Sequence, residues 1–289
     1  MPELPEVETV RRDLDKFVKG KKVIEINISA DFAKKIQPSM EELIRAVENR
    51  VLKNITRTGK MLVFDFGKNK KVLAHMKMTG QFVFVHPVTG SVSAGHPIKQ
   101  ISDQPHRFNK VFFNFGRHGK LYYNDIRKFG YLKLVNDQLA ELEQQKFGIE
   151  PVDRKFTMIE FTKLLDRRPD WSIKKFLLTQ DLISGIGNIY ADEACFEAGI
   201  LCTRKVQTLT SIDRENIRKS LKSILKKAIK YRGSSVNTYV DGSGQRGSYA
   251  QFLRVYGRAG EPCLRCGQTE IKKIKLVGRG TSFCPNCQK

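Results

Sequence analysis

The chain has 289 residues, which is enough for two folded domains with sizeable cores. Its 52 lysines and arginines outnumber 30 acidic residues and give a net charge of +22, which indicates a polyanionic partner, nucleic acid before an anionic membrane surface. No stretch approaches the roughly 18 apolar residues of a membrane span, and no secretory leader precedes the first charges. We therefore expect a cytoplasmic protein with no membrane partner.

The N-terminus carries a candidate nucleophile. If Met1 is removed, Pro2 becomes a terminal secondary amine, and an α-amino group titrates near about 7.7–8.0. Such an amine can attack an electrophilic carbon and form an iminium, and Glu3 and Glu6 could move protons beside it. The simpler alternative is that Pro2 only starts a helix, and a retained Met1 would make its nitrogen an amide.

The residues that follow predict an amphipathic helix over residues 5–19. Val7, Val10, Leu14 and Val18 recur at helical spacing, and a glycine at position 20 ends the pattern. The positive end of this helix would point at Pro2 and disfavour its ammonium form.

Alternating apolar and polar residues then predict β structure through the first half. Glycines and prolines separate the stretches, as expected for an antiparallel sandwich. The predicted strands are residues 23–28, 61–66, 81–86, 110–115 and 120–123. We expect residues 87–105 to form a mobile loop.

The second half is predicted to be helical, with a linker at residues 147–153. Helices are expected at residues 157–167, 173–179 and 188–199, a further one begins near residue 139, and a long amphipathic one covers residues 217–228. The lysine-rich face of that long helix is more often solvated than bound to a ligand.

Four cysteines near the C-terminus predict a metal site. Cys263 and Cys266 form one Cys-x-x-Cys pair, and Cys284 and Cys287 form another after 17 residues. Four thiolates suit a tetrahedral Zn²⁺ and leave no open position, so the zinc would be structural. A disulfide pair is the alternative, which the expected reducing compartment disfavours. The lysines and Arg279 between the two pairs suit phosphate binding.

These elements predict an α+β fold. It comprises an N-terminal β-sandwich with an N-terminal helix, a helical domain and a zinc finger. The expected boundaries are residues 1–137 for the sandwich, 138–153 for a linker region, 154–253 for the helical domain and 254–289 for the finger.

Several long motifs in this chain resemble those of one family. They are the start PELPEVETVRR, Lys60, residues 75–80, 125–130 and 185–193, and the last 36 residues. In this order they resemble the formamidopyrimidine-DNA glycosylases, bacterial enzymes that remove oxidised purines from DNA. The resemblance covers essentially the whole chain.

The resemblance implies a role for each matching position. Pro2 would attack C1′ of the damaged nucleoside, and Glu3 would transfer protons as the sugar ring opens. Lys60 would assist β-elimination, and Arg279, in the turn of a zinc β-hairpin, would grip phosphate and assist the second elimination.

Further positions would contact DNA by the same resemblance. Residues 185–193 match the turn of a helix–two-turn–helix motif, in which glycines and helix N–H groups bind phosphate. A flipped base leaves a gap that a flexible apolar, a stacking and a hydrogen-bonding side chain would fill. The implied DNA contacts are His75, Met78, His106, Arg127, Phe129, Arg168 and Asn188. A glycine-rich loop at residues 233–247 would close over the base.

The expected activity is therefore a bifunctional glycosylase and lyase that acts on 8-oxoguanine and formamidopyrimidines in double-stranded DNA. It would work as a zinc-containing monomer associated with the bacterial nucleoid. One alternative is the sister branch that removes oxidised pyrimidines. Another is a non-catalytic zinc-ribbon protein that binds nucleic acid, which would make no use of Pro2.

Overall fold

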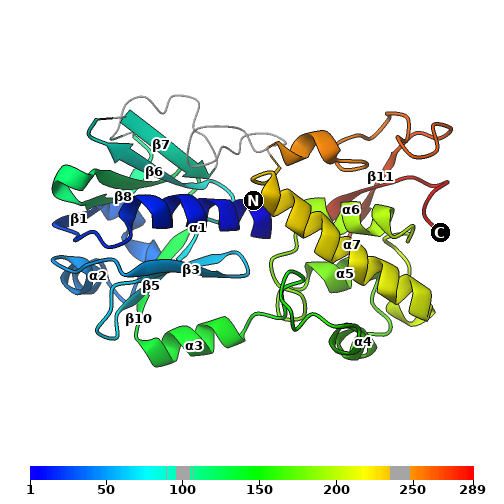
Figure 1. The fold of residues 1–289 in the computed structure, drawn as a ribbon, viewed down its shortest axis with the longest axis horizontal. Coiled ribbons are helices and arrows are strands. Elements are labelled where there is room, and N and C mark those ends of the chain that lie inside the picture. Colours follow the sequence, from blue (N-terminus) through cyan, green and yellow to red (C-terminus); the bar gives the residue numbers. More distant parts are fainter. Residues whose placement is uncertain (89, 96–104, 106, 235–247) are drawn as a thin grey trace. The chain divides into compact units, whose positions relative to one another are not determined.

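The computed structural model describes residues 1–88, 90–95, 105, 107–234 and 248–289 (Figure 1). The chain divides into two compact units, which we call unit 1 (Met1–Gln145 and Arg232–Ser248) and unit 2 (Lys146–Tyr231 and Tyr249–Lys289). The first division, after Gln145, falls inside the predicted linker region 138–153. The four predicted domain ranges and the three boundaries between them remain predictions.

Unit 1 is a β-sandwich with three helices. Its helices are α1 (Leu4–Val18), α2 (Met40–Val47) and α3 (Asp137–Gln145). Its strands are β1 (Glu25–Ile28), β2 (Ile36–Gln37), β3 (Asn54–Thr58), β4 (Met61–Asp65), β5 (Lys71–His75), β6 (Gly80–His86), β7 (Gly90–Gly95), β8 (Asn109–Asn114), β9 (Lys120–Asp125) and β10 (Tyr131–Val135).

The strands form two sheets of five strands each, in the orders β1-β8-β9-β6-β7 and β2-β10-β5-β4-β3. Neighbouring strands are antiparallel, except that the short β2 runs parallel to β10 with Ile36 opposite Leu132. Apolar side chains from both sheets meet in one core that includes Phe64 and Phe82. The predicted sandwich is confirmed.

Helix α1 closes one side of this sandwich. Val7, Val10, Leu14 and Val18 are buried in the shared core, and the helix contacts β3 and β7, the last strand of each sheet (Figure 1). The predicted amphipathic helix is confirmed, with bounds one residue earlier at each end.

The loop predicted for residues 87–105 is wrong in part. Residues 90–95 form β7, which pairs with β6 over its full length, from His86 opposite Gly90 to Gln81 opposite Gly95. β6 pairs with β9 along one edge, and its other edge offers hydrogen-bonding partners to residues 90–95. This pairing allows a segment rich in glycine and serine to form a strand. Residues 89 and 96–104 of the predicted loop lie outside the described residues, and the expected mobility stays a prediction.

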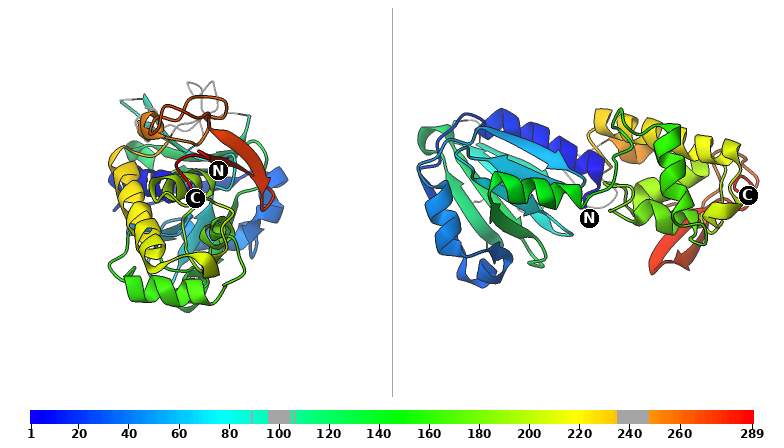
Figure 2. Two further views of the ribbon diagram at one scale, coloured as in Figure 1. Left: turned by 90° about the vertical axis from the view of Figure 1, so that its right-hand side faces the viewer. Right: turned by 90° about the horizontal axis from the view of Figure 1, so that it is seen from below.

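Unit 2 contains the predicted helices and the zinc hairpin. Its elements are α4 (Met158–Asp166), α5 (Ile173–Leu178), α6 (Asn188–Glu197), α7 (Ser211–Lys230), β11 (Lys272–Leu276) and β12 (Arg279–Phe283). Strands β11 and β12 pair as a hairpin that extends from the helices of this unit (Figure 2). The side chains of Thr157, Ser172 and Thr210 accept hydrogen bonds at the starts of α4, α5 and α7, where unpaired N–H groups favour such caps.

Candidate active site and nucleic-acid interface

The N-terminus of unit 1 is held by buried carboxylates. Pro2 is buried and immediately precedes α1, whereas 47% of the Met1 surface is exposed. The backbone N–H of Glu3 donates to Glu6 Oε2 at 2.9 Å. Glu6 Oε1 accepts from the N–H and hydroxyl of Ser234, at 2.7 and 3.1 Å. Glu3 and Glu6 are 4% and 3% exposed, so both acids lie at the start of α1 with little water around them.

Lys60 lies in a tight turn immediately before β4. Gly59 and Lys60 join β3 to β4, with Thr58 paired opposite Met61. Gly59 adopts φ +57°, a conformation that glycine accepts without a steric cost. Lys60 is only 4% exposed. The β3–β4 turn therefore carries an amine that has little contact with water.

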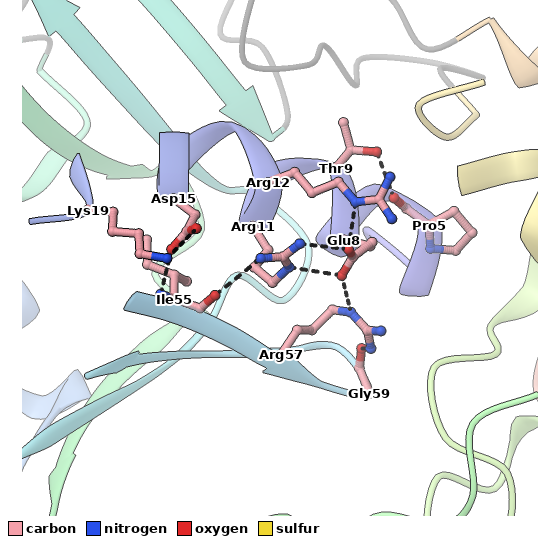
Figure 3. Close-up of polar contacts among 10 residues, drawn as sticks. All are labelled: Pro5, Glu8, Thr9, Arg11, Arg12, Asp15, Lys19, Ile55, Arg57 and Gly59. Carbon is pink, nitrogen blue, oxygen red and sulfur yellow. Dashed lines mark hydrogen bonds and ion pairs between the residues drawn. The ribbon is translucent and has the colours of Figure 1, made fainter. Parts of the chain in front are cut away.

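A charged network connects this turn to α1 (Figure 3). Arg57 Nη1 donates to the carbonyl of Gly59 at 2.7 Å, and Arg57 Nε donates to Glu8 Oε2 at 3.2 Å. Glu8 also accepts from Arg11 and Arg12. Burial raises the pKa of Glu8, but these three guanidiniums outweigh it and hold the pKa at about 2. Glu8 is therefore an anion at neutral pH and can hold Arg57 in place.

His75 is the last residue of β5, just before the turn that leads into β6. Burial lowers its pKa to about 3, and the positive charges of Lys77 and Lys60 add to this effect. The backbone N–H of Lys77 donates to His75 Nδ1 at 3.0 Å, so we place the ring hydrogen on Nε2. His75 can thus offer a hydrogen bond as a neutral donor.

The β5–β6 and β9–β10 turns bring together the side chains of Met78, Arg127 and Phe129. Arg127 Nη1 lies 3.4 Å from Met78 Sδ, and its guanidinium stacks over the Phe129 ring at 4.4 Å. Met78 and Phe129 are 43% and 45% exposed. Exposed apolar side chains around an arginine suit insertion between bases.

A buried acid shapes both of these turns. Asp125 accepts hydrogen bonds from the Thr79 hydroxyl and from the N–H groups of Arg127 and Gly130, at 2.5, 3.2 and 2.8 Å. Thr79 Oγ1 also accepts from the Arg127 N–H at 3.1 Å. The β5–β6 and β9–β10 turns are therefore fixed to each other, which keeps Met78 next to Arg127.

In unit 2, Asn188 lies beside the zinc hairpin. Asn188 is the first residue of α6, and its Nδ2 donates to the carbonyl of Gly280 at 2.8 Å. Arg279, the preceding residue, is exposed and begins β12 directly after the turn at residues 277–278. A helix N-terminus and an arginine on the adjoining strand both attract phosphate.

The four cysteines have the geometry of a zinc site. Their Sγ atoms all lie within 4.8 Å of one another. The distance from Cys263 to Cys287 is 3.9 Å, and that from Cys266 to Cys284 is 3.8 Å. Thiolates at 2.3 Å from a tetrahedral Zn²⁺ would be about 3.8 Å apart, so the residues fit this metal. Cys263 and Cys284 also pack against Phe196 of α6, which attaches the metal site to the helices.

Three family models match successive parts of the chain. The formamidopyrimidine-DNA glycosylase N-terminal domain matches residues 1–132, the H2TH domain of the same enzymes matches residues 147–240, and a zinc finger found in FPG and IleRS matches residues 260–289. The formamidopyrimidine-DNA glycosylase of Listeria monocytogenes is 38% identical over 292 residues, which cover 100% of both chains. The chain belongs to the formamidopyrimidine-DNA glycosylase family.

Solved structures of the family agree with this assignment. A mutant Lactococcus lactis enzyme in complex with Fapy-dG DNA has a TM-score of 0.87 and 34% identity, with 100% of each chain covered. The Lactococcus lactis enzyme in complex with abasic-site DNA has a TM-score of 0.86 and 34% identity, with 99% of each chain covered. As in the family, the four cysteines hold one structural zinc ion. Among the described residues, no helix is long and apolar enough to span a membrane.

Some site residues predicted from the family resemblance lie together and others do not. Within unit 1, Arg127 contacts both Met78 and Phe129, and the charge of Lys60 acts on His75. Within unit 2, Asn188 and Arg279 share the Gly280 junction. Arg168 is exposed and stacks on Trp171 at 5.0 Å. His106 and residues 235–247 lie outside the described residues.

Several residues that organise the family's site were missed by sequence reasoning. Lys174 is fully buried, and its Nζ donates to Asp192 Oδ1, Thr281 Oγ1 and the Gly280 carbonyl at 2.5, 2.7 and 3.1 Å. Asp192 Oδ2 accepts from the Ser282 N–H at 2.9 Å. This ion pair fixes the hairpin to α5 and α6. The start of α5 carries two adjacent lysines, and nothing in the sequence distinguishes buried Lys174 from half-buried Lys175.

Glu193 is a second buried acid that the motif did not explain. Its carboxylate accepts from the N–H groups of Arg254, Val255 and Tyr256 at 2.8–2.9 Å. Burial raises its pKa, and these hydrogen bonds oppose the shift. Glu193 therefore connects α6 to the segment that leads into the zinc finger.

Proposed function

We propose that this protein excises oxidised purines, 8-oxoguanine and formamidopyrimidines, from double-stranded DNA and then cleaves the strand as a lyase in base excision repair. The proposal depends above all on one arrangement: Pro2 precedes the positive end of α1, with the acids Glu3 and Glu6 buried beside it. The bacterial relatives further suggest that it acts on nucleoid DNA in the cytoplasm.

The chemistry begins at the Pro2 nitrogen after Met1 is removed. The secondary amine attacks C1′ of the flipped nucleoside and displaces the damaged base. Glu3 transfers protons as the sugar ring opens to the iminium. The iminium acidifies the 2′ hydrogens, so the 3′ phosphate leaves by β-elimination and the 5′ phosphate by a second elimination. Lys60 is assigned to the first elimination and Arg279 to the second.

The remaining residues are assigned to the duplex. Met78, Phe129 and Arg127 fill the space left by the flipped base, and Arg127 pairs with the orphaned partner. His75 donates to a phosphate as a neutral imidazole. Asn188 sets the start of α6, where backbone N–H groups bind phosphate, and Arg168 and His106 are further candidate phosphate contacts. The structural zinc holds the hairpin that carries Arg279.

Borohydride reduction tests the covalent step. Zinc-replete protein, with Met1 removal verified by mass spectrometry, is mixed with duplexes that contain 8-oxoguanine or an abasic site, and the iminium is reduced to a stable adduct. We expect wild-type protein to form the adduct and Pro2→Gly to lose it. Pro5→Ala, which changes the other proline at this helix start, should still form it.

Two results would contradict the proposal. Equal trapping by Pro2→Gly would exclude Pro2 as the nucleophile. Faster excision from a duplex with an oxidised pyrimidine such as thymine glycol than from the 8-oxoguanine duplex would place the enzyme with the sister branch.

A further inference from the structure

A groove on unit 1 carries four basic side chains among its eight lining residues and is not used by the proposed reaction. It has a volume of about 500 Å³ and lies between the end of α2, the connection to β3 and the β4–β5 hairpin. Four cations line it, Arg45, Arg50, Lys53 and Lys68, against one acid, Glu48. We call this surface the basic groove.

The four positive charges form no close ion pair among the described residues, although Arg45 lies near Glu41 and donates to its carbonyl at 3.4 Å. Glu48 Oε1 is engaged by the Ile26 N–H at 3.2 Å. Like charges closer than the Debye length of about 8 Å repel one another, so the basic groove would be stabilised by an anion.

The backbone presents these side chains from fixed positions. The carbonyl of Arg50 accepts from the Val23 N–H at 2.9 Å, and the Lys53 N–H donates to the Asp65 carbonyl at 2.7 Å. These contacts join the walls of the groove to the strand and helix ends around it. The cations are therefore arranged by the fold rather than carried on a flexible tail.

Gly67 leaves the space that Lys53 occupies. A Cβ built on Gly67 would lie 2.4 Å from Lys53 Cε and 2.8 Å from its Nζ. The Lys53 side chain thus lies across the β4–β5 hairpin beside the position of Lys68. The absence of a side chain at Gly67 leaves room for the Lys53 side chain, and both Lys53 and Lys68 line the basic groove.

The basic groove lies at the other end of α1 from Pro2. The Gly20 N–H, just after the helix, donates to the Leu52 carbonyl at 2.7 Å, and Leu52 lies between Arg50 and Lys53 in the chain. The 15 residues of α1 span roughly 22 Å at 1.5 Å per residue. The groove is therefore separate from the residues around the nucleophile.

We propose that the basic groove binds the phosphodiester backbone of a second stretch of DNA while the first is held for base excision. DNA is the polyanion that the solved relatives bind. Three of the cations are exposed and Arg50 is half-buried. Cations along a surface groove suit a linear backbone, whose neutralised phosphates release counterions. Two backbone sites would let the protein transfer between DNA segments. This inference rests on the DNA binding of the proposed function but not on chemistry at Pro2.

The test compares a groove variant with a charge-matched control. The groove variant is Arg50→Gln/Lys53→Gln/Lys68→Gln, and the control, Lys222→Gln/Lys226→Gln/Lys230→Gln, removes the same charge from α7. Each protein is saturated with a short unlabelled duplex that carries an abasic analogue. A labelled undamaged duplex is then added at low and rising salt, and anisotropy and native mass spectrometry report the ternary complex.

We expect wild type and control to bind the second duplex, with affinity that falls as salt rises. The groove variant should bind it roughly tenfold more weakly, with a salt slope smaller by about 2–3, because about 0.9 is lost per phosphate contact. Affinity for the short duplex should be unchanged, as should the rate of base excision from a separate duplex that contains 8-oxoguanine. A Pro2→Gly protein should give the same binding result, which separates this proposal from the reaction.

Three outcomes would overturn the proposal. The first is the absence of a ternary complex in wild type. A groove that only strengthens binding of a longer first duplex counts as this outcome, because no second duplex is then bound. The second is equal binding of the second duplex by wild type and the groove variant. The third is an equal loss in the control, which would show a diffuse charge effect.

Discussion

Arg57 donates to Glu8 at 3.2 Å, and this contact joins the helix that follows Pro2 to the turn that carries Lys60 (Figure 3). The Arg57 side chain is 8% exposed and that of Glu8 is 12% exposed, so water screens the pair poorly. Because Arg57 also holds the Gly59 carbonyl, its position determines where the Lys60 backbone lies.

We predict that Arg57→Lys slows strand cleavage roughly ten- to hundredfold, because lysine cannot reach Glu8 and Gly59 together and a small misplacement of a catalytic group is costly. Single-turnover cleavage of an abasic duplex measures this effect, and DNA affinity should change little. Arg12→Gln is the control, since Arg12 contacts Glu8 but not the turn. Equal rates for Arg57→Lys and wild type would refute the positioning role.

Loss of the buried Lys174 charge should destabilise unit 2. Lys174→Met removes the cation from beside Asp192, whose pKa burial already raises to about 6, so the carboxyl should take up a proton. Breaking a buried pair in this way costs about 3–5 kcal/mol, and Lys174→Met/Asp192→Leu should recover most of this. Urea unfolding followed by circular dichroism measures the change. Lys175→Met, which removes a cation from the Trp171 ring, should cost less than about 1 kcal/mol. A single Lys174 variant as stable as wild type would contradict the inferred ion pair.

Zinc removal should weaken DNA binding through the hairpin. The metal fixes the cysteines that pack against Phe196, and structural zinc sites supply folding free energy to small segments. We expect strong chelation to lower duplex affinity at least tenfold and to increase proteolysis after residue 260, with a metal-binding dye to quantify release. Zinc addition should restore both. Unchanged affinity after complete release would show that the hairpin does not contribute.

His75 should remain neutral in the folded protein from about pH 5 to 8. Its folded pKa of about 3 lies below the unfolded value of about 6.5. As pH falls below about 6.5, the unfolded chain therefore binds a proton that the folded chain does not, and stability decreases until the pH reaches about 3. An NMR titration of the ring, assigned with His75→Gln, checks this. A midpoint near 6.5 in the folded state would disprove it.

Local sequence predicted the elements whose signal lies within a few residues. Helix α1 follows from apolar residues at a helical period, and the zinc site follows from the spacing of two cysteine pairs. In contrast, α2 and the strands β2, β3, β5, β7 and β10 were not predicted. Each of these strands is short and is stabilised by the neighbouring strand, so its partners lie elsewhere in the chain.

By itself, the sequence determined which residues carry the functional groups. These are the amine at Pro2, the thiolates of the zinc site, and the family-motif side chains that fill the gap in the duplex or bind phosphate. Only the tertiary structure decided that Arg57 connects Glu8 to the Lys60 turn, that Lys174 is buried against Asp192, and that Lys53 crosses Gly67 into the basic groove. Motifs are local in sequence, whereas a buried charge gains its partner from a distant segment, and burial then sets the strength of that interaction.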